Sequence, residues 1–242
     1  MASDETSTPW LQPKFLIAAV LVIALVVLGV VIAFSGRDEP SGASSAPTAT
    51  SSATTPAPVD AGVESVCGLP GYAESGTLTT APAAEWPFQG TTAYPTSLEF
   101  GPGVTSPEGV RYCFQHTPSG ALFAAANAIV QGSFVDTSGA WIEYFLSKQT
   151  PNRDQLVNDT AMGASAETRM NIVGFRVLAY DGETARIDLA VRAVGSGNTV
   201  YGSAVYDLVW EEGDWRLLPL DASNPLRLAQ IPDASGYITW EE

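Results

Sequence analysis

Two carboxylates in the second half of the sequence could form an acid–base pair. Asp188 and Asp207 lie on adjacent predicted strands, and they would act together only if both faced inward and one held a proton. Asp188 alternates with Ile187 and Leu189, which belong to the apolar phase of their strand, so its side chain should face solvent. Asp207 alternates in the same way with Tyr206. We therefore expect two solvent-facing carboxylates and no catalytic pair.

His116 is the single histidine of the chain, so a triad or an imidazole metal site would have to use it. It directly precedes Thr117 and Pro118, which are typical of a helix N-cap and first helical position, and this favours a packing and hydrogen-bonding role. The lack of a second histidine or a Cys-x-x-Cys argues against zinc. Neither Gly101–Gly103 nor Gly195–Gly197 opens a helix after a strand, as a phosphate cradle would. We predict no catalytic, cofactor-binding or metal-binding residue and no enzyme activity.

The two cysteines, Cys67 and Cys113, are predicted to form a disulfide. An isolated even pair fits an oxidising compartment, and closing a loop of this length would stabilise the fold by about 4 kcal/mol. Two unrelated buried thiols are the alternative.

Three aromatic residues lie where no core stripe requires them. Trp86, Phe88 and Tyr94 belong to a proline-rich stretch, residues 67–112, which we interpret as an irregular arm pinned by the disulfide. These side chains either pack the arm onto the domain or form a docking surface for a partner.

A run of twenty residues without a charge extends from Phe15 to Phe34. At about 1.5 Å per residue a helix of this length spans roughly 30 Å, so we predict a single transmembrane helix. A cleaved signal peptide is the alternative, but the apolar run is too long for one, and the fourteen residues before it contain only one basic residue, Lys14. The predicted organisation is a cytoplasmic tail (1–14), the membrane helix (15–34), a disordered Ser/Thr/Ala/Pro stalk (35–66) and an extracytoplasmic domain (67–242). The protein is thus predicted in the cell membrane, with its N-terminus cytoplasmic.

Residues 113–242 are predicted to form an α+β unit, because helical periodicity gives way to alternation near Met170. We expect about three helices packed on a four-stranded antiparallel meander. The helices cover 118–130, 140–148 and 153–162, and the strands cover 172–180, 184–194, 199–211 and 214–220. The formal net charge of −15 argues against direct binding of nucleic acid.

The segment from Cys113 to Ala125, with its Cys-Phe-x-His-Thr-Pro-x-Gly-Ala-Leu pattern, resembles a signature of uncharacterised single-pass membrane proteins of actinobacteria. Cys67–Pro70 and Pro95–Gly103 extend the resemblance. It implies an association with conjugative and mobile elements. The layout of the chain also resembles the scaffold subunits of type IV secretion systems, which implies an ectodomain similar to nuclear transport factor 2 (NTF2-like).

These observations lead to the hypothesis of a non-enzymatic, membrane-anchored scaffold or accessory subunit of a conjugative transfer or type IV secretion-like apparatus. Its partners would be other envelope proteins and a second copy of the chain. An extracytoplasmic small-ligand-binding or isomerase-like protein of the same broad fold is the alternative. It would need an ionisable group near the hydroxyl of Tyr144, Tyr201 or Tyr206, between sheet and helices. A surface or cell-wall-facing binding protein is a third possibility.

Overall fold

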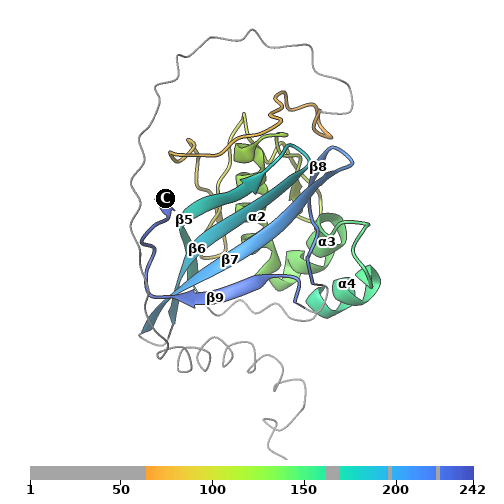
Figure 1. Ribbon diagram of the computed structural model, residues 1–242. Coiled ribbons are helices and arrows are strands. Elements are labelled where there is room, and N and C mark those ends of the chain that lie inside the picture. The colour runs from red at the N-terminus through yellow and green to blue at the C-terminus, as the bar shows by residue number, and fades with distance from the viewer. Residues whose placement is uncertain (1–63, 162–168, 196–197, 222–223) are drawn as a thin grey trace, which may run out of the picture. The chain divides into compact units, whose positions relative to one another are not determined.

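In the computed structural model, a six-stranded antiparallel sheet covers a largely buried helix (Figure 1). The described residues are 64–161, 169–195, 198–221 and 224–242. Among them no helix is long and apolar enough to cross a membrane. The predictions of an integral membrane protein and of a single-pass localisation are thereby corrected, because no described helix could provide the span. The predicted tail (1–14), membrane helix (15–34) and stalk up to residue 63 lie outside the described residues.

An antiparallel sheet dominates the described part of the chain, with 38% of residues in strands and 20% in helices. Five of its six strands follow in the order β10–β5–β6–β7–β8, and the sixth, β9, pairs with a separate stretch of β7. The strands are β5 (Arg169–Tyr180), β6 (Thr184–Gly195), β7 (Asn198–Glu211), β8 (Asp214–Leu217), β9 (Arg227–Ile231) and β10 (Ile238–Thr239).

The predicted fold class, an NTF2-like α+β domain on a four-stranded meander, is wrong. The meander itself is present as β5 to β8, but the C-terminal segment adds strands at two edges of the sheet. β9 pairs with β7 through Tyr201 and Ile231, and β10 pairs with β5 through Phe175 and Ile238. The side chains of β9 are nearly all exposed and β10 has two residues, so neither strand has an alternating pattern to reveal it.

Alternation along β6 divides the sheet into two faces. Ile187 and Leu189 are fully buried on the inner face, which is covered by helices. Arg186 and Asp188 point to the outer face, as the period of two requires. This part of the sequence prediction is confirmed.

Three helices are present in the described residues: α2 (Pro118–Gly132), α3 (Val135–Phe145) and α4 (Arg153–Ala161). α2 begins as predicted, because Thr117 Oγ1 accepts a hydrogen bond from the Gly120 amide at 3.2 Å and Pro118 occupies the first turn. Nearly all of α2 is buried, and it lies behind the sheet in Figure 1, against β5 and β6. α3 packs against α2 and β8, and α4 packs against α3.

Aromatic side chains fill the space between α2 and the inner face. Trp240 packs against Phe123 and Phe175, with ring centroids 5.2 and 5.6 Å apart, and Tyr206 is also buried there. Such rings bury large apolar areas and prefer edge-to-face contacts of this kind. The C-terminal segment, which carries Trp240, therefore belongs to the core.

The arm from 67 to 112 contains more pairing than predicted. The predicted disulfide between Cys67 and Cys113 is present. Two short hairpins interrupt the arm: β1 (Phe88–Gln89) with β2 (Thr92–Ala93), and β3 (Val104–Thr105) with β4 (Arg111–Tyr112). The first hairpin lies against β5.

Candidate functional site

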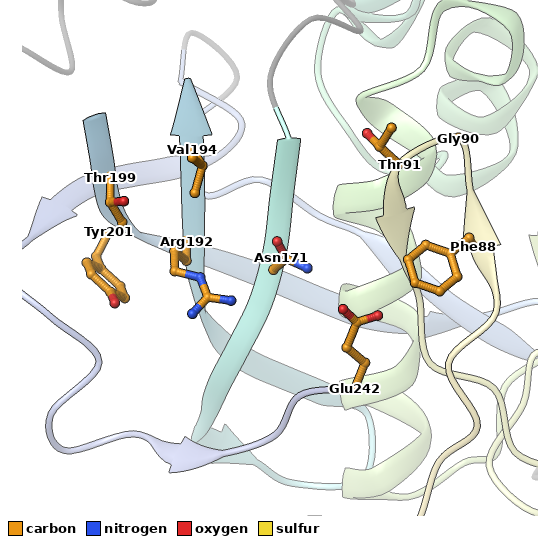
Figure 2. Close-up of a pocket in the computed structure, with 9 residues that line it drawn as sticks. All are labelled: Phe88, Gly90, Thr91, Asn171, Arg192, Val194, Thr199, Tyr201 and Glu242. Atoms are coloured by element: carbon orange, nitrogen blue, oxygen red, sulfur yellow. The ribbon is translucent and has the colours of Figure 1, made fainter. Parts of the chain in front are cut away.

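A surface pocket of about 800 Å³ opens between the β1–β2 hairpin and one end of the sheet (Figure 2). Its volume falls in the range of ligand sites, roughly 300–1,000 Å³. Nine residues line it: Phe88, Gly90, Thr91, Asn171, Arg192, Val194, Thr199, Tyr201 and Glu242.

The floor of the pocket comes from β5, β6 and β7. Arg192 of β6 is in direct register with Asn171 of β5 on one side and with Tyr201 of β7 on the other. Val194 and Thr199 form the next outward-facing pair. Because side chains alternate between faces, both rows project from the outer face of the sheet. The floor thus combines an amide, a guanidinium, a phenol and a hydroxyl.

The β1–β2 hairpin forms one wall of the pocket. The Phe88 ring is 59% exposed at this wall, and Val194 across the floor is 41% exposed. The hairpin turns at Gly90, whose φ of +57° lies in the left-handed region. A Cβ at this position would also come within 2.7 Å of the Phe134 ring. The turn therefore requires glycine on two grounds.

A buried polar network holds the hairpin in place. Arg111, only 6% exposed, donates from Nη1 to Gln89 Oε1 and from Nε to Asn127 Oδ1, both at 2.7 Å. Its guanidinium lies 3.8 Å from the centre of the Tyr94 ring, and Gln89 Nε2 donates to Thr137 at 3.1 Å. Gln89 follows Phe88 directly, so the network holds the strand that carries the exposed ring.

Burial lowers the pKa of Arg111 to about 10, which leaves the guanidinium charged at neutral pH. Its Nη2 is buried without a hydrogen-bond partner among the described residues. Within the described residues, the charge is therefore held by neutral amide oxygens and an aromatic ring.

The three residues predicted as a docking surface lie in different environments. Trp86 packs on Trp240 at 5.0 Å between ring centroids, and Tyr94 lies under Arg111, so both attach the arm to the domain. Phe88 alone projects outward, into the pocket. Docking stays a prediction, and the geometry limits it to Phe88.

Asp188 is buried, contrary to the prediction of a solvent-facing carboxylate. It is 1% exposed, accepts hydrogen bonds from Ser203 Oγ at 2.6 Å and Tyr237 Oη at 2.9 Å, and pairs with the Arg176 guanidinium. The alternation did assign Asp188 to the outer face correctly. The C-terminal segment that carries Tyr237 then covers this face, which the local pattern could not indicate.

Asp207 pairs with Arg186 and Arg227 at 2.6 and 2.8 Å. The strand register places Asp207 opposite Arg186 and not opposite Asp188. The two carboxylates thus belong to separate sets of ion pairs.

His116 packs in the core, as the sequence indicated. Its Nε2 lies 2.5 Å from the Gly182 carbonyl oxygen, and its ring stacks on Trp210 with centroids 3.8 Å apart. Within the described residues, no group of three or more His, Cys, Asp or Glu side chains is placed to hold a metal ion.

The three tyrosines considered as hydroxyl donors do not meet. Tyr144 donates to the buried Asp214 at 2.8 Å, Tyr206 lies in the core, and Tyr201 faces the surface pocket. Burial raises the pKa of Tyr206, so its phenol stays protonated at neutral pH. Complete burial also raises the pKa of Asp214, although the Cys113 and Phe114 amides donate to it.

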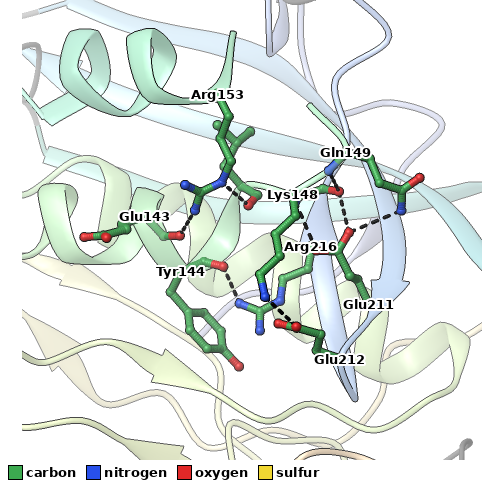
Figure 3. A network of polar contacts seen from close by, with 10 residues as sticks. Glu143, Tyr144, Lys148, Gln149, Arg153, Glu211, Glu212 and Arg216 are labelled. Carbon is green, nitrogen blue, oxygen red and sulfur yellow. Dashed lines mark hydrogen bonds and ion pairs between the residues drawn. The ribbon is translucent and has the colours of Figure 1, made fainter. Parts of the chain in front are cut away.

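A second polar cluster joins the end of α3 to the β7–β8 turn (Figure 3). Glu211 accepts hydrogen bonds from Ser147 Oγ at 2.6 Å, the Lys148 amide at 3.0 Å and Gln149 Nε2 at 3.2 Å. Partial burial opposes ionisation, but these donors together hold the pKa of Glu211 below its usual value. Lys148 pairs with Glu212 at 2.5 Å. The cluster is a structural clamp, because its members are engaged with one another.

Most of the pocket was missed from the sequence. Arg192 could be assigned to the outward phase of its strand, but nothing local showed that Asn171 and Tyr201 flank it. Glu242 reaches the pocket only through the C-terminal segment, which was not predicted to pair with the sheet.

Comparisons with curated proteins and with solved structures gave no match. A family model described as a domain of unknown function (DUF8175) matches residues 46–239, which is most of the chain and includes the whole sheet. The chain therefore belongs to the DUF8175 family.

Proposed function

We propose that this domain is a non-enzymatic scaffold or accessory subunit that binds other proteins through the pocket beside Phe88. The observation that carries the proposal is a large apolar ring held in solvent by a rigid, buried network. Phe88 is 59% exposed, yet its neighbour Gln89 is fixed by Arg111 and Thr137. A preorganised aromatic side chain at a concave surface is typical of the anchors that dominate protein interfaces.

The assembly it serves would be a conjugative transfer or type IV secretion-like apparatus. This part of the proposal comes from the resemblance of the Cys113–Ala125 segment to proteins of mobile elements. It predicts partners that are encoded by the same element as this chain.

The filled interior supports a binding role over an isomerase-like one. An enzyme pocket between sheet and helices needs space there, whereas Phe123, Phe175 and Trp240 occupy it. The ionisable groups of the inner region are also committed, since Asp214 accepts four hydrogen bonds. The surface pocket beside Phe88, in contrast, offers about 800 Å³ of open space.

Site-specific photocrosslinking tests the proposal. In cells that carry the mobile element encoding this chain, a photoreactive amino acid at position 88 should capture another subunit encoded by that element. The same amino acid at Leu98, which is fully exposed and does not line the pocket, is the matched control. Phe88→Ser should reduce co-purification of that subunit and transfer of the element, and Leu98→Ser should not. Equal capture from both positions, or normal transfer by Phe88→Ser, would refute the proposed function.

A further inference from the structure

We infer that the pocket binds a carboxylate of a partner segment, with Arg192 as the cationic anchor and Phe88 in contact with an apolar group beside it. The inference rests on the proposed function, since it specifies what the partner presents. It is argued from the charges of the outer face and from the donors on the pocket floor.

Arg192 differs from the other arginines whose side chains are described on the outer face of the sheet. Arg176 pairs with Asp188, and Arg186 and Arg227 pair with Asp207. Arg216 of β8 has no ion pair among the described residues, but it donates to the Tyr144 carbonyl oxygen and its guanidinium lies 3.5 Å from the centre of the Tyr144 ring. Arg192 is half-buried, and no carboxylate among the described residues lies within salt-bridge distance of it. The chain has a formal net charge of −15, so carboxylates are abundant, yet none of the described ones forms an ion pair with this guanidinium.

The neighbours of Arg192 suit an oxygen-bearing ligand. Asn171 and Tyr201 are its direct cross-strand neighbours, so residues that carry an amide and a phenol lie on the two strands beside Arg192, at a strand spacing of about 4.8 Å. All three groups donate hydrogen bonds, and a guanidinium can bind both oxygens of one carboxylate. Figure 2 shows these side chains together on the floor, with Thr199 beside them.

Glu242 favours a singly charged group over a phosphate. Its side chain lines the same pocket, from the side of the hairpin (Figure 2). A dianionic phosphate would face this carboxylate as well as the negative charge of the whole chain, and both interactions are repulsive. A monoanionic carboxylate bound at Arg192 experiences less of this repulsion.

The apolar part of the pocket supplies the second contact. Phe88 on the hairpin and Val194 on the floor are both exposed and both line the pocket. A ligand that carries a carboxylate next to an apolar or aromatic group would therefore fill both halves. Such a ligand corresponds to the C-terminal residue of a partner chain, whose α-carboxylate lies next to its apolar side chain.

Two small probes that differ only in charge test the inference. N-acetyl-L-phenylalanine carries the carboxylate and the ring, and its primary amide is the neutral match. In NMR titrations of the ¹⁵N-labelled full chain, the carboxylate should shift the Asn171 side-chain amide and the Arg192 and Tyr201 backbone amides. It should bind about tenfold more tightly than the amide, as expected for a charge-assisted hydrogen bond at a half-exposed site.

Substitutions identify the anchor. Arg192→Gln should reduce the preference for the carboxylate to less than about twofold, and Arg192→Lys should leave an intermediate preference. Lys148→Gln removes the same charge from a side chain that is 67% exposed and outside the pocket, and it should leave the preference unchanged. Equal affinity for both probes, an unchanged preference in Arg192→Gln, or tighter binding of inorganic phosphate at the same amides would overturn the inference.

The outcome is separable from that of the proposed function. A carboxylate preference that depends on Arg192, together with no partner captured at position 88, would retain the binding chemistry and reject the scaffold role. Capture of an element-encoded subunit at position 88, together with no carboxylate preference, would retain the scaffold role and reject the binding chemistry.

Discussion

Replacement of Asn127 by leucine should be among the most destabilising changes of a single polar residue in this domain. Asn127 is fully buried on α2, and its Oδ1 accepts the 2.7 Å hydrogen bond from Arg111 Nε. Its Nδ2 donates to the carbonyl oxygen of Pro95 at 2.9 Å. Asn127→Leu keeps the approximate size of the side chain and removes both functions.

The expected loss is about 3 kcal/mol of unfolding free energy. A hydrogen bond to a charged group contributes about 1.5–3 kcal/mol, and the Pro95 carbonyl, left without this donor, adds about 1 kcal/mol. Arg111 would keep its bond to Gln89, but its Nη2 is already buried without a hydrogen bond among the described residues. Loss of one partner from a buried charge is therefore not compensated locally.

Urea denaturation followed by tryptophan fluorescence, with the disulfide intact, measures this loss. Thr150→Val is the matched control, because Thr150 Oγ1 is buried without a hydrogen-bond partner in the described part of the chain and its removal should be neutral or stabilising. The double variant Asn127→Leu with Arg111→Met should recover at least about 1 kcal/mol relative to the sum of the two single changes. A loss below about 1 kcal/mol for Asn127→Leu, or strict additivity, would show that the guanidinium does not depend on Asn127.

Other predictions concern the hairpin, the clamp and the disulfide. Gly90→Ala should destabilise the fold by about 1–2 kcal/mol in the same assay and weaken capture of a partner at position 88, because the turn has a φ of +57°; unchanged values would contradict the role of the turn. Since the pKa of Glu211 is lowered on folding, its stabilising contribution is present above the ordinary value of 4.5 and is lost as pH falls through the folded value. Unfolding free energies measured from about pH 6 to 3 should therefore decline less steeply in Glu211→Gln than in the unmodified protein, and parallel curves would refute this. Replacing both Cys67 and Cys113 by serine should cost about 4 kcal/mol in thermal unfolding, given a separation of 46 residues; a change below about 1 kcal/mol would rule out the loop-entropy account.

Local sequence signals predicted the elements whose causes are local. Thr117 and Pro118 marked the start of α2, and alternation around Ile187 identified β6 and its inner face. α3 begins at Val135 and not at Ala140 as predicted. The first turn of this helix has no sequence signal: its N-cap residue makes no side-chain capping bond, and a glycine inside the helix suggested a break.

The features that were missed depend on contacts between distant segments. Asp188 was assigned to the correct face, but Tyr237 covers it from 49 residues away. Arg111 and Gln89 lie in an arm without periodicity, and their partner Asn127 resembles any polar residue of a helix. The register that aligns Asn171, Arg192 and Tyr201 follows from the turns between strands, one of which includes residues outside the described part. Composition and period constrain which face a side chain occupies but not what covers that face.

The distribution of arginines gives the strongest physical reason to regard the pocket as a binding site. On the outer face, acidic side chains neutralise Arg176, Arg186 and Arg227, and in the arm the neutral oxygens around Arg111 take the place of a carboxylate. Each of those guanidinium groups is held by this chain's own residues. Arg192 has no such arrangement among the described residues, and it lies in a cavity of about 800 Å³ next to an exposed aromatic ring. A half-buried cation without an acidic partner is more stable when a partner supplies the carboxylate, so the same feature that weakens the isolated domain would strengthen its complex.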